Sequence, residues 1–164
     1  MGSDSAATDS EGRQLIRADP KVFRVGAFLI GFCGSFRMGQ LLRFKLTPPP
    51  HRRTIATDRY LGTLFLDTVR QTLAEGGYAR KQNNVETGGN FLVGYRGRLF
   101  EIEGDFQVGE SAYPYSAIGS GADVALGAMF NRSGEPKVRI YNALKAAAAF
   151  SAGVRAPYKI EVIG

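Results

Sequence analysis

The chain of 164 residues, with 44% hydrophobic and 11% aromatic residues, can bury one core of ordinary size but is too short for two independent domains. We therefore expect a single domain over residues 1–164. The net charge of +6 comes from basic residues scattered along the chain, which favours a solvated surface over a nucleic-acid site. Nucleic-acid binding is a further hypothesis that rests on this charge alone, and we expect no nucleic-acid partner.

The single cysteine, the single histidine and the hydropathy of the chain limit which cellular compartment and which kinds of chemistry we expect. The single cysteine, Cys33, excludes an internal disulfide, and its apolar surroundings predict a buried core residue rather than a nucleophile. No window has the pattern of a signal peptide or of a membrane span, so we expect a cytoplasmic protein with no membrane partner. His51 is the only histidine, and we therefore predict no Ser-His-Asp triad, no metal and no other cofactor.

In the first half of the chain, a pair of strands precedes a pair of helices. The predicted elements are a loose polar tail over 1–14, strands over 22–25 and 28–33, a helix from Ser35 to Leu46 and a helix from Thr57 to Glu75. Ser35 has a side chain suited to cap a helix, and Gly76-Gly77 can provide a left-handed stop. Apolar residues recur three to four apart in the second helix, so the two helices should pack as one layer.

The second half of the chain repeats this order. The predicted elements are a polar loop over 80–89, a hairpin with arms 90–95 and 98–103, a turn over 117–121, helices from Ala122 to Phe130 and from Pro136 to Phe150, and a strand over 158–163. Strands gathered in blocks and helices in pairs indicate an α+β fold with antiparallel sheets. We expect a four-layer αββα sandwich of two antiparallel sheets covered by helix pairs.

Four segments resemble, in order and spacing, motifs of proteasome β subunits and of the bacterial peptidase HslV. They are GSDSAAT from Gly2, KVF from Lys21, FCGS from Phe32 and AIGSGAD from Ala117. The chain looks closer still to small proteasome-like proteins of bacterial and phage genomes, which share the sequences RADPKVFR, GSFRMGQLLR and FSAGVR. The resemblance implies the N-terminal-nucleophile (Ntn) hydrolase fold and a threonine-type endopeptidase activity.

In this family, the chain's first residue, a Thr, Ser or Cys, attacks a carbonyl with its side chain while its own α-amino group handles the proton. Here the first residue is Met1, and the resemblance places the nucleophile about a dozen positions before Asp4, on a first strand that is missing. Three explanations stay open: a start codon assigned too late, a truncated or degenerate gene, and a chain that works without catalysis.

The resemblance implies five site residues. Lys21 would lower the pKa of the nucleophile, Asp4 would position that lysine, Gly34 would donate its N–H to the oxyanion, Ser120 would lie beside the nucleophile's amino group, and Ser151 matches the last family serine. Each of the first four also has a plain structural interpretation: a surface lysine, an Asx turn, a turn glycine and a helix N-cap. The chain departs from the proteasome pattern at Ala148, where that pattern has an aspartate.

The resemblance also implies partners. A peptide or amide substrate and a homo-oligomeric ring are expected, while the ring size and any ATPase unfoldase partner stay open. The alternative function is a catalytically inactive proteasome-like subunit that acts in assembly or interaction.

Overall fold

The computed structural model describes residues 1–83, 85–130 and 133–163, and its centre is an antiparallel sheet of five strands in the order β10-β9-β8-β5-β4. These strands are β4 (Val22–Val25), β5 (Phe28–Phe32), β8 (Phe91–Tyr95), β9 (Arg98–Ile102) and β10 (Val108–Glu110). The hairpins β4/β5 and β8/β9 are those predicted, and Gly26 and Gly97 turn them with φ of +55° and +75°. Glycine adopts this left-handed conformation without steric cost, which explains the tight turns.

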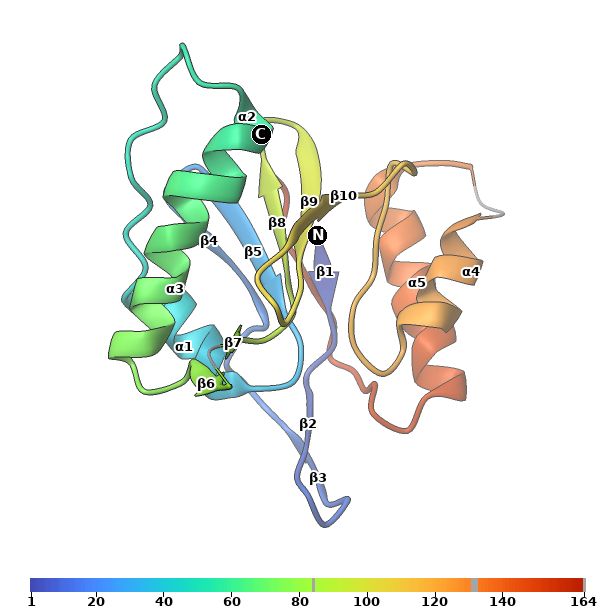
Figure 1. Cartoon of the computed structure of the whole chain (residues 1–164). Helices are drawn as coiled ribbons and strands as arrows, with labels where there is room; N and C mark the ends of the chain where they lie inside the picture. Colours follow the sequence, from blue (N-terminus) through green and yellow to red (C-terminus); the bar gives the residue numbers. More distant parts are fainter. Residues whose placement is uncertain (84, 131–132, 164) are drawn as a thin grey trace.

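One face of this sheet is covered by the first helical layer (Figure 1). The layer consists of α1 (Phe36–Phe44) and of one continuous helix made of α2 (Thr57–Tyr60), a π-helical turn η1 (Leu61–Phe65) and α3 (Leu66–Glu75). Ser35 caps α1 by accepting a hydrogen bond from the Met38 N–H at 3.3 Å, as predicted. Alternate strand residues such as Phe28, Ile30 and Val93 pack against these helices and form the main core.

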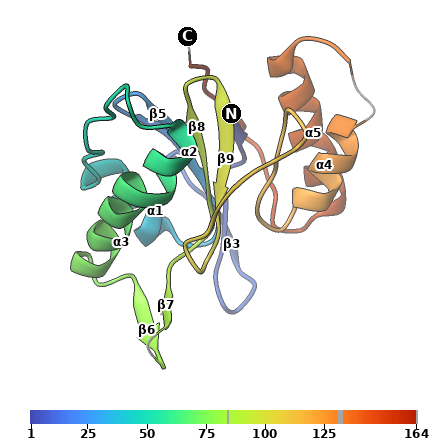
Figure 2. The ribbon, with the colours of Figure 1, turned by 45° about the horizontal axis from the view of Figure 1, so that its top comes forward.

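The opposite face of the sheet is approached by two short strands and two helices (Figures 1 and 2). The strands β1 (Gly2–Ser3) and β11 (Lys159–Ile160) pair with each other, and α4 (Ala122–Phe130) and α5 (Pro136–Phe150) have the predicted bounds. Met1 packs over Gly31 of the sheet, whereas Gly2 lies against Ile140 of α5. The small pair of strands therefore lies between the large sheet and the outer helices.

The outer helices have a small core of their own. It comprises Ala125, Met129, Ala143, Ala147 and Val154. The α+β class is thus confirmed, with helices on the two sides of the strands. No helix in the described ranges is long and apolar enough to cross a membrane.

Three predictions about local structure were wrong. Residues 1–14 are not a loose tail, because β1 pairs with β11 and β2 (Ala6–Thr8) forms a hairpin with β3 (Gln14–Ile16). The polar segment 80–89 contains a second hairpin of β6 (Arg80–Gln82) and β7 (Val85–Thr87). In these segments backbone pairing, which polar side chains do not reveal, decides the structure.

The third error concerns the last strand, predicted over 158–163. A strand needs a paired neighbour, and β11 is limited to Lys159–Ile160 because β1 opposes it over only two residues. Beyond it, Met1 and Glu161 exchange two further hydrogen bonds, of 2.7 and 2.9 Å.

Two helical glycines give a matched test of packing. A β-carbon at Gly39 would lie 2.2 Å from the buried ring of Phe32, whereas one at Gly62 would meet nothing within 4 Å. We expect Gly39→Ala to lower the free energy of unfolding by about 1–3 kcal/mol, because the ring must move in a packed core. Gly62→Ala should raise it by about 0.5–1 kcal/mol. Urea unfolding of both variants measures this, and a stabilised Gly39→Ala would contradict the packing.

Candidate active site

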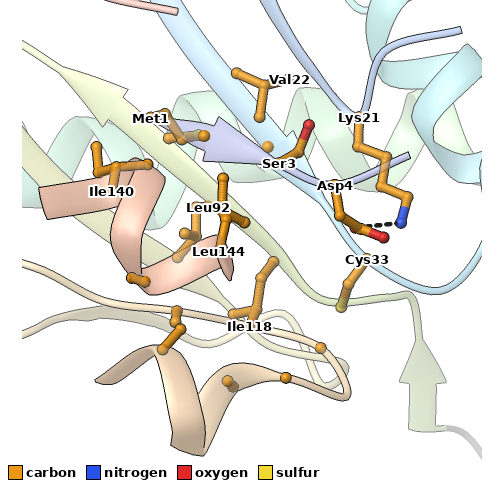
Figure 3. A pocket seen from close by; sticks show the side chains of 18 of the residues that line it. Met1, Ser3, Asp4, Lys21, Val22, Cys33, Leu92, Ile118, Ile140 and Leu144 are labelled. Atoms are coloured by element: carbon orange, nitrogen blue, oxygen red, sulfur yellow. Dashed lines mark hydrogen bonds and ion pairs between the residues drawn. The ribbon is translucent and has the colours of Figure 1, made fainter. Parts of the chain in front are cut away.

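A nearly buried ion pair joins the beginning of the chain to the beginning of β4. The Lys21 ammonium lies 2.6 Å from Oδ1 of Asp4, and each side chain is only 12% exposed (Figure 3). The other carboxylate oxygen accepts hydrogen bonds from the Ala6 N–H at 2.8 Å and the Arg155 N–H at 3.2 Å. Asp4 is therefore held by two backbone donors and holds the lysine in turn.

Local sequence explains why these two side chains meet. Asp4 follows β1 and bonds the backbone two residues on, which is an Asx turn. Lys21 directly precedes β4, and its carbonyl accepts a hydrogen bond from the Phe32 N–H at 3.0 Å. The Asx-turn interpretation of Asp4 thus holds together with the ion pair, while Lys21 is not a free surface lysine.

The ion pair lies at one end of a long cavity of about 690 Å³. Its two sides are β1 with Asp4 and the extended segment 114–121, which leads into α4. The large sheet contributes Leu29, Leu92 and Leu99, and the outer helices contribute Met129, Ile140 and Leu144. We call this cavity the groove. It is mostly apolar, although Lys137 and Arg139 of α5 also line it, and it is polar at the end where Asp4 and Lys21 lie (Figure 3).

Gly34 lines the same polar end of the groove. It directly follows Cys33 after β5 and has a φ of +73°, a conformation that favours glycine. Its N–H makes no hydrogen bond within the described part of the chain. Among the described residues, the Gly34 N–H is therefore a free backbone donor in the cavity that Lys21 also lines, and such a donor can stabilise a developing oxyanion.

The two predicted serines lie together. Ser120 lines the groove, and Ser151 does not, but the Ser151 hydroxyl donates to the Ser120 carbonyl at 3.2 Å. Gly153 leaves the room for this arrangement, because a β-carbon there would lie 2.4 Å from Oγ of Ser120. The structure thus brings Asp4, Lys21, Gly34 and Ser120 to one cavity and places Ser151 directly behind it.

The prediction that Cys33 is a buried core residue was wrong. Its thiol is half-buried and lines the groove next to Gly119, where a β-carbon would lie 3.1 Å from that of Cys33. Desolvation raises the pKa of the Cys33 thiol above its ordinary value, and the positive charge of Lys21 opposes this only in part. The apolar run of β5 suggested burial, but β5 ends one residue earlier, at Phe32.

Alkylation of Cys33 should report on this environment. Because only the thiolate reacts, we expect the rate with iodoacetamide to rise with pH through a midpoint above about 8.5, the value for a free cysteine. Replacing Lys21 with methionine removes the charge that lowers this pKa, so the midpoint should move further upward. Mass spectrometry of samples quenched at a series of pH values gives both midpoints. A lower midpoint in the Lys21→Met variant would contradict the assignment.

Sequence reasoning missed the part played by Arg155. Besides its N–H bond to Asp4, its guanidinium donates to the carbonyls of Val154, Ser151 and Ala148 around the end of α5. A cation is favourable at a helix C-terminus, and here it stands beside Ala148, where the proteasome pattern has a carboxylate. Nothing in the local sequence pointed to this residue.

His51 lies away from the groove and has a structural role. Its ring stacks on Tyr60 at 4.1 Å between centroids, and its two nitrogens lie 3.0 Å from the Tyr95 hydroxyl and 2.8 Å from the Ile55 carbonyl. Both nitrogens are therefore occupied. In the part of the chain that the structure describes, no group of three or more His, Cys, Asp and Glu residues is arranged to hold a metal.

Solved structures of proteasome-like proteins share this fold. BPH, a bacterial proteasome homologue from Thiobacillus denitrificans, superposes with a TM-score of 0.75 in its complex with epoxomicin, at 20% identity over 96% of this chain and 88% of that chain. HslV from Trypanosoma brucei gives 0.63 at 16% identity over 98% and 90%, and Anbu from Yersinia bercovieri gives 0.62 at 17% over 96% and 73%. No protein-family model and no curated protein matches the chain. The predicted resemblance is confirmed at the level of the fold, which this chain shares with BPH, HslV and Anbu.

Proposed function

We propose that the protein is a peptidase of the proteasome β and HslV kind, which cleaves amide bonds by acyl transfer to an N-terminal Thr, Ser or Cys. In this proposal, the nucleophile is carried by a segment upstream of Met1. The observation that carries the proposal is the nearly buried pair of Lys21 and Asp4 at the polar end of the groove. Burying a charged pair is costly, so a position that serves only stability is more often filled by apolar residues.

Each group at this end of the groove has a role in such a reaction. The charge of Lys21 lowers the pKa of the nucleophile, and Asp4 with its two backbone donors fixes the lysine. The N–H of Gly34 stabilises the oxyanion of the tetrahedral intermediate. Ser120 orients the α-amino group that takes and returns the proton, and Ser151 fixes the backbone of Ser120.

The experiment that tests this function starts from the native cellular protein. Intact mass and N-terminal sequencing should show a chain that begins with Thr, Ser or Cys about a dozen residues before Asp4. Such a chain should hydrolyse a fluorogenic peptide and gain the mass of epoxomicin, the compound bound to BPH. Native chains that begin at Met1 or Gly2 would rule out this mechanism.

A catalytically inactive subunit that acts in assembly is the second candidate. It is favoured by Ala148 and the Arg155 guanidinium at the position where the proteasome pattern has an aspartate. The hydrolysis assay distinguishes the two functions, and mass photometry tests assembly: an inactive subunit should form closed oligomers without hydrolysing the peptide. The homo-oligomeric ring and the cytoplasmic location stay predictions.

A further inference from the structure

The groove lies between two backbone edges with which a further β-strand could pair. On one side, Met1 and Glu161 exchange hydrogen bonds, so the alternation of an antiparallel ladder turns the N–H and C=O of Gly2 away from β11, toward the groove. On the other side, the backbone of 115–118 makes no hydrogen bond within the described residues. Two unpaired backbone edges therefore face each other across the cavity.

The walls specify the side chains that such a strand would carry. Toward the large sheet it would meet Leu29, Leu92 and Leu99, and toward the outer helices Ile140 and Leu144. A strand that is covered on both faces is a continuous run of apolar residues rather than an alternating one. The occupant is therefore an extended, continuously apolar segment of about six residues, the common length of a strand.

We propose that the groove is an acceptor site for a β-strand and that it binds such a strand from a separate peptide, without a covalent link to Met1. The walls are already assembled from the large sheet, the outer helices and the 115–118 segment, so the site does not need the incoming strand to form. Main-chain pairing on both edges would give affinity, and the apolar walls would select the side chains.

The direction of the strand links this inference to catalysis. β1 runs from Met1 toward Asp4, so a strand antiparallel to β1 begins at the polar end, beside Lys21 and Gly34. The placement of the peptide's amino group next to Lys21 rests on the proposed function, whereas the binding of the strand does not. Binding and hydrolysis can therefore be tested separately on the same samples.

The probe is the peptide Thr-Val-Val-Ala-Val-Val-Lys-Lys-amide, in which apolar residues follow a threonine and the last lysine carries the label. A second peptide has alanine as its first residue. We expect saturable binding of both by fluorescence anisotropy, protection of Cys33 from alkylation, and loss of affinity when a central peptide nitrogen is methylated. Leu144→Lys places a charge in the groove and should weaken binding at least about tenfold. Val138→Lys, on the same helix but outside the groove, should leave the affinity within about twofold.

The outcomes separate the two proposals. Absence of binding, or equal binding to Leu144→Lys and Val138→Lys, overturns the acceptor site. If circular dichroism shows that the Leu144→Lys variant is unfolded, Ile118→Lys takes its place in this comparison. Binding of both peptides with hydrolysis by the threonine-headed complex supports both proposals. Binding of both without hydrolysis supports the acceptor site, and the covalently extended chain then tests the function: absence of hydrolysis by that chain counts against the proposed function. Hydrolysis by a covalently extended chain without binding of either peptide overturns the acceptor site and leaves the function standing.

Discussion

In a chain extended by a strand that begins with threonine, replacing Lys21 with alanine should lower kcat/KM for a peptide substrate by roughly 10²–10³-fold. The ammonium is the cation that Asp4 holds at the polar end of the groove, at 2.6 Å. Without it, the nucleophile keeps a higher pKa and the developing negative charge loses a fixed positive neighbour. Initial rates with a fluorogenic peptide, measured from pH 6 to 9, should show both the fall and an upward shift of the profile.

Lys159→Ala is the matched control for this experiment. Lys159 also pairs with a carboxylate, Glu161 at 3.1 Å, but its side chain is 53% exposed and lies on β11. We expect this control to retain the rate of the parent within about twofold, as for an exposed pair. Equal rates for Lys21→Ala and the parent would remove Lys21 from the mechanism, and a folded Lys21→Ala protein by circular dichroism keeps that result interpretable.

The regular elements could be predicted because their signals are local. Ser35 as a cap, the Arg96-Gly97 turn and the start of α5 at Pro136 each follow from side chains within a few residues. The hairpins β2/β3 and β6/β7 could not be predicted in this way. Their strands are only three residues long and their apolar residues Leu15, Ile16 and Val85 are exposed, so pairing depends on backbone hydrogen bonds rather than on an apolar face.

At the candidate site, too, some groups could be predicted from the sequence, whereas contacts made by the backbone could not. The resemblance to proteasome β subunits and HslV implied Asp4, Lys21 and Gly34, three groups that the fold brings to one end of the groove. Arg155 was missed because its N–H, a group that every residue except proline carries, reaches Asp4. Cys33 was misplaced because the apolar run of β5 hides the point at which the strand leaves the core.

The division of the protein into two cores explains why the groove matters for the whole molecule. The main core joins the large sheet to α1–α3, and the smaller one joins α4 to α5. Between them lie β1 and β11, which pack on α5, and the groove. A strand in the groove would add apolar contacts to both sides, so we infer that its binding couples the two cores as well as completing the site.

Removal of the Asp4 carboxylate should have the largest effect on stability. Asp4→Ala leaves the Lys21 ammonium nearly buried without its partner, and two backbone N–H groups lose their acceptor. We expect the free energy of unfolding to fall by about 3 kcal/mol. Lys21→Met should cost less, because the remaining carboxylate keeps its two backbone donors, each worth roughly 1.5–3 kcal/mol when the acceptor is charged.

A double-mutant cycle separates these contributions. The Asp4→Ala, Lys21→Met double variant should be more stable than the sum of the two single losses implies, because no buried charge is left unpaired. The exposed Lys159 and Glu161 pair provides the reference cycle, with an expected coupling of about 0–1 kcal/mol. Urea unfolding at pH 7 measures all variants. Additive losses at Asp4 and Lys21 would mean that the two side chains are not coupled, and the site would then lose the positioning that makes Lys21 a fixed charge.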